Sequence, residues 1–147
     1  MLSIIKGDIF TAPDNYSICH CISADFKLGA GIAYEIDKRF GTRDDLFRLF
    51  PDYYNTFKAN NYDSSCILTG RIINLVTKEK YYHKPTYNSL YKSLLLMKDL
   101  CIRNNIYHIA MPEIGCGLDG LKWDKVYPMI DKLFGKDVEF HIIIYSL

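Results

Sequence analysis

Two glycine-containing segments have the residue types that let a backbone approach an anionic ligand closely. The first, Gly29-Ala30-Gly31, carries no bulky side chain and directly precedes a predicted helix. The free N–H groups and partial positive charge of a helix N-terminus favour phosphate, so this segment predicts a phosphate site. The pattern matches neither the nucleotide P-loop nor the dinucleotide fingerprint. A tight turn between a strand and a helix is therefore the alternative interpretation.

The second segment, residues 114–119 (Ile-Gly-Cys-Gly-Leu-Asp), follows a predicted strand and ends in a carboxylate. Two such loops on neighbouring strands could hold a pyrophosphate between them. Cys116 has a nucleophilic sulfur, but no histidine or carboxylate pattern marks it as activated, so we expect a small packed thiol. Asp119 has an alternative role as a helix-capping acid.

One lysine and one further aspartate are candidates for direct contact with a ligand. Lys84 precedes Pro85, which biases its backbone toward an extended conformation and so fixes where the amine points. The alternative is a solvated surface lysine, the usual fate of this residue type. Asp8 follows the first predicted strand and has an alternative role as a turn former.

The segment Cys19-His20-Cys21 could be interpreted as a zinc site. In a strand, however, alternation sends His20 to the face opposite the two cysteines, and no second ligand pair follows at zinc-ribbon spacing. A core strand is the preferred interpretation, and we expect no bound metal.

The elements that position these residues follow from hydrophobic periodicity and turn residues. Strands are predicted at residues 1–6, 16–22, 66–68, 71–77, 107–111 and 139–145. Helices are predicted at residues 32–40, 44–50, 87–103 and 123–134, while residues 53–65 are polar, Asn-rich and expected to form an irregular surface excursion. Strands that alternate with helices favour a largely parallel sheet, covered on both faces, with ligands at the carboxyl ends of the strands. The loops at residues 23–31 and 113–120 lie at such strand ends, so they are the candidate ligand-binding loops.

Composition limits the class of protein further. The length of 147 residues predicts one domain, residues 1–147, and the net charge of +1 gives no bulk attraction to nucleic acid or anionic lipid. No apolar run is long enough to span a bilayer, and the start lacks the pattern of a secretory signal. The five cysteines are scattered and odd in number, which favours a reducing setting. We expect a monomer without a membrane partner, located in the cytoplasm or, in a eukaryote, also in the nucleus.

Taken together, these segments resemble the macrodomain family, which binds ADP-ribose. The resemblance covers nearly the whole chain in order, at residues 6–10, 20–23, 29–33 and 111–119. Within the family, His83-Lys84-Pro85-Thr86-Tyr87, Gly117-Leu118-Asp119 and the closing Tyr145-Ser146-Leu147 are similar to the branch of terminal ADP-ribose protein glycohydrolases and O-acetyl-ADP-ribose deacetylases. Ser23 stands where many other macrodomains carry a catalytic Asn, which favours the lysine and aspartate of this branch.

The resemblance implies a three-layer α/β/α fold with a central mixed, largely parallel sheet, and no cofactor. It implies that Lys84 and Asp119 are catalytic and face the anomeric carbon C1″. Asp8 would accept the adenine amino group and Ile9 would offer its backbone. The remaining ligand-binding residues that it implies are Ser23, Gly29, Ala30, Gly31, Ile32, Ala33, Ile114, Gly115, Cys116, Gly117, Leu118, Tyr145 and Leu147.

The implied function is hydrolysis of the bond between terminal ADP-ribose and an acyl acceptor, either a protein Glu or Asp side chain or the acetyl group of O-acetyl-ADP-ribose. Two rival functions remain: a reader that binds ADP-ribose without turnover, and a phosphatase that acts on ADP-ribose 1″-phosphate. A reader would not need Lys84 or Asp119, and both are present. ADP-ribosylated nucleic acid is a third class of acceptor, which the near-neutral charge disfavours.

Overall fold

Six β-strands form one sheet in the computed structural model, which describes residues 1–147. The strands are β1 (Leu2–Lys6), β2 (Ser17–Ser23), β3 (Ser65–Thr69), β4 (Ile72–Lys78), β5 (His108–Pro112) and β6 (His141–Ser146). Their order across the sheet is β1-β6-β5-β2-β4-β3, and every neighbouring pair is parallel except β3 and β4. All six predicted strands are therefore present, with ends shifted by no more than two residues.

Five α-helices connect these strands. They are α1 (Gly31–Phe40), α2 (Thr42–Leu49), α3 (Tyr53–Ala59), α4 (Tyr87–Arg103) and α5 (Trp123–Ile130). A short 3₁₀ turn (Ile9–Thr11) follows β1, and a π-helical turn (Asp131–Gly135) extends α5. Gly41 ends α1 in the left-handed conformation, with φ of 65°, which a residue without Cβ adopts without strain. None of the helices combines the length and the apolar character that a bilayer crossing requires.

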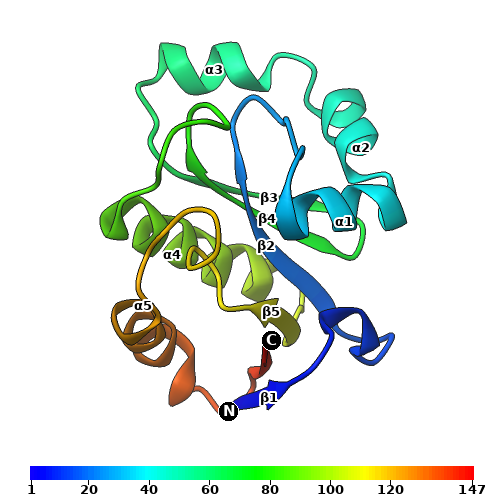
Figure 1. The fold of residues 1–147 in the computed structure, drawn as a ribbon, viewed down its shortest axis with the longest axis vertical. Coiled ribbons are helices and arrows are strands. Elements are labelled where there is room, and N and C mark those ends of the chain that lie inside the picture. The colour runs from blue at the N-terminus through cyan, green and yellow to red at the C-terminus, as the bar shows by residue number, and fades with distance from the viewer.

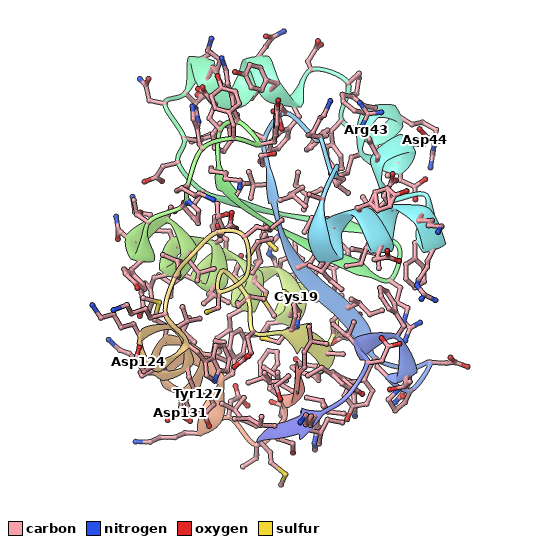
Figure 2. The ribbon with its side chains drawn as sticks, viewed as in Figure 1. Cys19, Arg43, Asp44, Asp124, Tyr127 and Asp131 are labelled. Atoms are coloured by element: carbon pink, nitrogen blue, oxygen red, sulfur yellow. The ribbon has the colours of Figure 1, made fainter.

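The helices cover both faces of the sheet. Adjacent strand residues point to opposite faces, so Ile72 packs on the side of α1 while Ile73 packs on the side of α4 and α5. Figure 1 shows α4 and α5 on one side of the strands and α1 on the other. Cys19, labelled in the interior in Figure 2, is fully buried on the side of α4 and α5. The result is the three-layer α/β/α arrangement.

The expectation that residues 53–65 form an irregular surface excursion was wrong. Residues Tyr53–Ala59 form α3, and Phe57 is only 1% exposed. The spacing of four residues between Tyr53 and Phe57 places both rings on one helix face, where the Tyr53 ring stacks on that of Phe26 at 5.0 Å between centroids. The polar residues between the two rings concealed this short apolar stripe, which supports the loop after β2.

Candidate functional site

A cavity of about 610 Å³ lies at the carboxyl ends of the parallel strands. The predicted site residues that line it are Ser23, Gly29, Ala30, Gly31, Ile32, Ala33, Lys84, Ile114, Gly115, Cys116, Gly117, Leu118, Asp119, Tyr145 and Leu147. We call this cavity the main cavity. Two predicted residues, Asp8 and Ile9, are not among those that line it.

The position of the main cavity follows from the topology of the sheet. The neighbouring strands β2 and β5 send their connections to opposite faces, because β2 leads to α1 and β5 leads to α5. Such a switch point leaves a crevice between the two outgoing loops, and ligands bind there in open α/β sheets.

The first loop, residues 24–30, connects β2 to α1 and is held by buried apolar residues. Phe26 and Leu28 are 1% and 5% exposed, although both have positive φ values, of 54° and 42°. Residues other than glycine adopt that conformation at a cost, which the packing around them offsets. Arg43, which projects from α2 in Figure 2, also donates a hydrogen bond from Nε to the Phe26 carbonyl oxygen at 3.0 Å. Contacts with α2 and α3 therefore fix the position of this loop.

The first loop presents a helix N-terminus to the main cavity. Ala30 caps α1 without a side-chain hydrogen bond, and the N–H groups of Ile32 and Ala33 have no partner within the protein. Both residues line the cavity. Unpaired N–H groups at a helix N-terminus are suited to the oxygen atoms of a phosphate.

The second loop, residues 113–120, connects β5 to α5 and closes on itself at its base. The Gly115 carbonyl oxygen accepts a hydrogen bond from the Leu121 N–H at 2.8 Å. Gly115 has φ of 75°, and a Cβ atom there would lie 3.0 Å from the Leu121 side chain. A Cβ atom at Gly117, in contrast, would meet nothing within 4 Å. The base of the loop requires glycine, and its tip leaves room for a ligand.

An ion pair at the main cavity gives Asp119 a partner that the sequence analysis did not name. Lys78 Nζ lies 2.6 Å from Asp119 Oδ1, and the two side chains are only 13% and 15% exposed. Lys84 donates from Nζ to the Leu118 carbonyl oxygen, on the residue next to Asp119. The two predicted catalytic residues, Lys84 and Asp119, are thus brought together at the second loop, and Lys78 adds a second amine there. A sign of this partner was present in the sequence, because Lys78 directly follows the apolar run 72–77. That run forms β4, which pairs with β2, the strand that leads into the first loop.

The cysteines beside this ion pair are thiols rather than thiolates at neutral pH. Burial, and to a smaller extent the Glu113 carboxylate, raise the pKa of Cys116 to about 11. The Cys116 Sγ donates to the Ile114 carbonyl oxygen at 3.3 Å. Burial, and then the Asp119 carboxylate, also raise the pKa of Cys21. These features favour the packed-thiol interpretation of Cys116, because the thiolate is the nucleophilic form.

Comparison with known proteins assigns the family. The sequence model of the Macro domain matches residues 56–130, which are 75 of the 147 residues. ADP-ribose glycohydrolase OARD1 of Homo sapiens is 40% identical over 147 aligned residues, which cover 99% of this chain and 91% of the human protein. The chain belongs to the macrodomain family.

Solved structures show that the macrodomain fold extends over the whole chain. The macrodomain of Mycobacterium tuberculosis DarG superimposes with a TM-score of 0.78 at 22% identity, and covers 99% of this chain and 97% of its own. Thermosipho africanus DarTG, solved in complex with ADP-ribose, gives a TM-score of 0.72 at 18% identity and covers 99% of this chain and 41% of its own. The predicted α/β/α macrodomain fold is confirmed.

In this macrodomain, Asp8 and Ile9 have local roles that are visible in the structure. Asp8 is exposed, and its carboxylate accepts a hydrogen bond from the Phe10 N–H at 2.9 Å, so it caps the 3₁₀ turn. Ile9 is buried in an apolar cluster together with Tyr145, which does line the main cavity. The predicted contact of Asp8 with adenine stays a prediction.

The histidine of the Cys19-His20-Cys21 segment lies on the face predicted for it, away from Cys19. His20 Nε2 is 2.6 Å from Asn74 Oδ1 in the interior. Since the Asn74 amide nitrogen donates to Thr69 and Ile67, its oxygen is the acceptor and His20 Nε2 carries the proton. Burial lowers the pKa of His20 to about 4, which keeps the ring neutral.

Proposed function

We propose that this macrodomain is an ADP-ribosyl hydrolase that releases terminal ADP-ribose from acyl-linked Glu or Asp acceptors and deacetylates O-acetyl-ADP-ribose. One observation carries the proposal: a single cavity is lined by both glycine-containing loops, by the amine of Lys84 and by the carboxylate of Asp119. The 40% identity to an ADP-ribose glycohydrolase over nearly the full chain supports it.

The loops supply binding in this proposal. The unpaired N–H groups of Ile32 and Ala33 would receive the diphosphate, and the open tip at Gly117 would let the phosphate and distal ribose approach the backbone. Ser23 and Tyr145, at the carboxyl ends of β2 and β6, also line this cavity.

Lys84 and Asp119 supply the chemistry. The neutral Lys84 amine attacks C1″, the bond from C1″ to the acyl oxygen breaks, and the acceptor leaves as a carboxylate with the electron pair. Asp119 takes the proton that the new C–N bond displaces from the amine. Asp119 then returns this proton to the adduct nitrogen and is again a carboxylate. A water molecule adds at C1″ and gives a proton to Asp119, the C–N bond breaks with its electron pair returning to the Lys84 nitrogen, and ADP-ribose leaves with a free 1″-hydroxyl group. The Lys78 amine orients the Asp119 carboxylate for these proton transfers.

The test is to incubate the protein separately with ADP-ribosylated protein, O-acetyl-ADP-ribose and ADP-ribose 1″-phosphate, and to quantify free ADP-ribose. We expect release from the two acyl-linked substrates. Binding of ADP-ribose without release from any substrate would make the protein a reader. Release from the 1″-phosphate alone would make it a phosphatase.

The adenine contact of Asp8 belongs to the same proposal and needs its own control. Asp8→Ala should weaken ADP-ribose binding roughly tenfold, because the adenine amino group would lose a charge-assisted partner. The substitution also removes the cap on the Phe10 N–H. Asp8→Ser retains a capping oxygen and lacks the carboxylate, so it should weaken binding as Asp8→Ala does. Unchanged dissociation constants in calorimetry for both variants would remove Asp8 from the site.

A further inference from the structure

A second cavity, of about 270 Å³, adjoins the main cavity. It lies between the segment that follows α3 and the segment that connects β4 to α4. Lys78 and Lys84 are the two residues that line both cavities. A ligand whose reacting atom lies at these amines can therefore extend from one cavity into the other. The volume of the second cavity corresponds to on the order of nine water molecules, which is more than an acetyl group fills.

The second cavity differs from the main cavity in chemistry. Its other walls include Thr77, Glu79, His83 and Asp63, so hydrogen-bonding groups replace the glycine backbone and apolar side chains. His83 Nδ1 accepts a hydrogen bond from the Lys80 N–H at 3.2 Å, so the ring proton is on Nε2, which is a donor. This set of donors and acceptors is suited to a polar chain.

Thr77 gives independent evidence that the second cavity receives a ligand. The residue is 2% exposed, and its hydroxyl oxygen is buried without a hydrogen-bond partner. A buried hydroxyl group is normally paired, so an unpaired one beside a cavity indicates a partner that binds there. Thr77 also lies at a register shift: Ile22 pairs with Val76, and Ser23 with Lys78. Such bulges re-aim side chains next to functional sites.

The charges of the second cavity distinguish a peptide from a nucleic acid. The two lysines of its lining, Lys78 and Lys84, lie where it meets the main cavity, and Lys78 is paired with Asp119. Of its two acidic residues, Asp63 pairs with Lys92 at 3.2 Å in an exposed salt bridge, and Glu79 has no ion-pair partner. A free carboxylate beside the acceptor repels phosphate groups and attracts a basic side chain.

We propose that the second cavity is the acceptor subsite, which binds the polypeptide around an ADP-ribosylated Glu or Asp, with a basic neighbouring residue facing Glu79. The inference rests on the proposed function for the identity of the acceptor. ADP-ribose occupies the main cavity, its C1″ lies at Lys84, and the peptide continues past Lys78 into the second cavity.

The first experiment measures binding, so it does not depend on turnover. The ligand is a peptide that carries ADP-ribose on a glutamine amide, which replaces the ester and resists hydrolysis. The wild-type protein should bind this peptide more tightly than free ADP-ribose. Thr77→Val removes the hydroxyl group at nearly constant shape, and it should weaken peptide binding about three- to tenfold while the dissociation constant of free ADP-ribose stays the same.

Thr42→Val is the matched control. Thr42 is also buried, at 1% exposure, with an unpaired hydroxyl oxygen, but it lies in α2 and lines neither cavity. It should leave peptide binding unchanged. Equal weakening by both variants, or a wild-type protein that binds the peptide no more tightly than ADP-ribose, would overturn the subsite.

The second experiment tests charge. The wild-type protein should prefer a peptide with lysine beside the modified residue over one with glutamate by about two- to fivefold, and Glu79→Lys should reverse that preference. Glu139→Lys makes the same charge change just before β6, at the opposite end of the parallel strands, and should keep the wild-type preference. An unchanged preference in Glu79→Lys would exclude Glu79 from peptide contact.

Two further measurements separate the subsite from the proposed function. The wild-type protein should bind an ADP-ribosylated oligonucleotide no more tightly than free ADP-ribose. Tighter binding that Thr77→Val abolishes would show that the subsite accepts nucleic acid, and would overturn its assignment to a peptide. Wild-type protein that fails to release ADP-ribose from the ester-linked peptide would refute the hydrolase proposal alone. The binding differences above would then still decide the subsite.

Discussion

The two loops that line the main cavity are built in different ways. The first loop is anchored by buried apolar residues, Phe26 and Leu28, and by the hydrogen bond from Arg43. The second loop exposes 68% of Leu118 at its tip, and the neighbouring Asp119 is paired with Lys78 at the end of β4. Apolar packing extends along the first loop, whereas in the second it is confined to the base, at buried Ile114, and the tip is held by the ion pair and by the hydrogen bond from Lys84 to Leu118.

This difference matches the tasks proposed for the two loops. A diphosphate keeps the same charge throughout the reaction, so a rigid set of N–H groups in the first loop is sufficient to bind it. Proton transfer requires a carboxylate within reach of the reacting atoms, and Asp119 in the second loop lines the main cavity, where it is paired with the Lys78 amine. The comparison therefore predicts that substitutions in the first loop reduce stability and those in the second reduce activity.

The largest expected effect is on the chemical step. Lys84→Ala should lower turnover by roughly 10²- to 10⁴-fold and spare ADP-ribose binding, because both loops remain. Asp119→Ala should let the lysine attack proceed and leave ADP-ribose attached to the enzyme. Intact-mass spectrometry after incubation with ADP-ribosylated protein should find the added mass in Asp119→Ala and not in Lys84→Ala or the double variant. Wild-type turnover by Lys84→Ala would contradict the lysine mechanism.

The next largest effect is on folding and tests the first loop. Phe26→Ala should lower the free energy of unfolding by about 3–5 kcal/mol, because it empties a buried site between α2 and α3. Leu118→Ala is the matched change in the second loop, and it should alter stability by less than about 0.5 kcal/mol, because the side chain is mostly exposed. Urea denaturation of both variants measures the difference. Similar losses would mean that the two loops are anchored alike.

A third prediction concerns pH and the strand that leads to the first loop. Burial lowers the pKa of His20 from 6.5 to about 4, so between these values the unfolded chain binds a proton that the folded protein does not. Stability should therefore be complete above about pH 6.5 and fall by about 3 kcal/mol as the pH drops to 4.

His20→Gln tests this directly, because an amide nitrogen can replace Nε2 as the donor to Asn74 and does not titrate. Urea denaturation from pH 7.5 to 4 should show a weaker pH dependence in this variant than in the wild type. His141→Gln, at the start of β6, is the matched control. This variant should retain the pH dependence of stability that the wild type shows. The same slope in His20→Gln and wild type would exclude His20 as its source.

The smallest expected effect is on binding at the tip of the second loop. Gly117→Val should weaken ADP-ribose binding at least about tenfold, because a branched side chain blocks approach of the phosphate to the backbone. The protein should fold normally, since a Cβ atom there meets nothing within 4 Å. Calorimetry measures the affinity, and the melting temperature reports the fold. Full affinity in Gly117→Val would place the second loop outside the ligand site.

The sequence by itself determined the elements and the two loops. Strand alternation, the four-residue spacing of Ile32, Ile36 and Phe40, and glycine at the helix ends are local patterns, and local patterns carry the secondary structure. Because the strands are parallel, the ends that carry Gly29 and Gly115 had to meet at one edge of the sheet. The macrodomain family, and the position of Lys84 and Asp119 near one another, were predicted from the resemblance of the motifs to that family.

Only the tertiary structure decided which groups pair. The Lys78 and Asp119 partnership depends on a register shift between β2 and β4, and the support of the first loop depends on α3, whose two apolar rings lie within a polar segment. The sequence pattern likewise gave no sign that Asp8 lies outside the main cavity or that Thr77 stands unpaired beside a second one. Such contacts join residues far apart in the chain, and one residue of register changes which side chains face each other, so no local period can specify them.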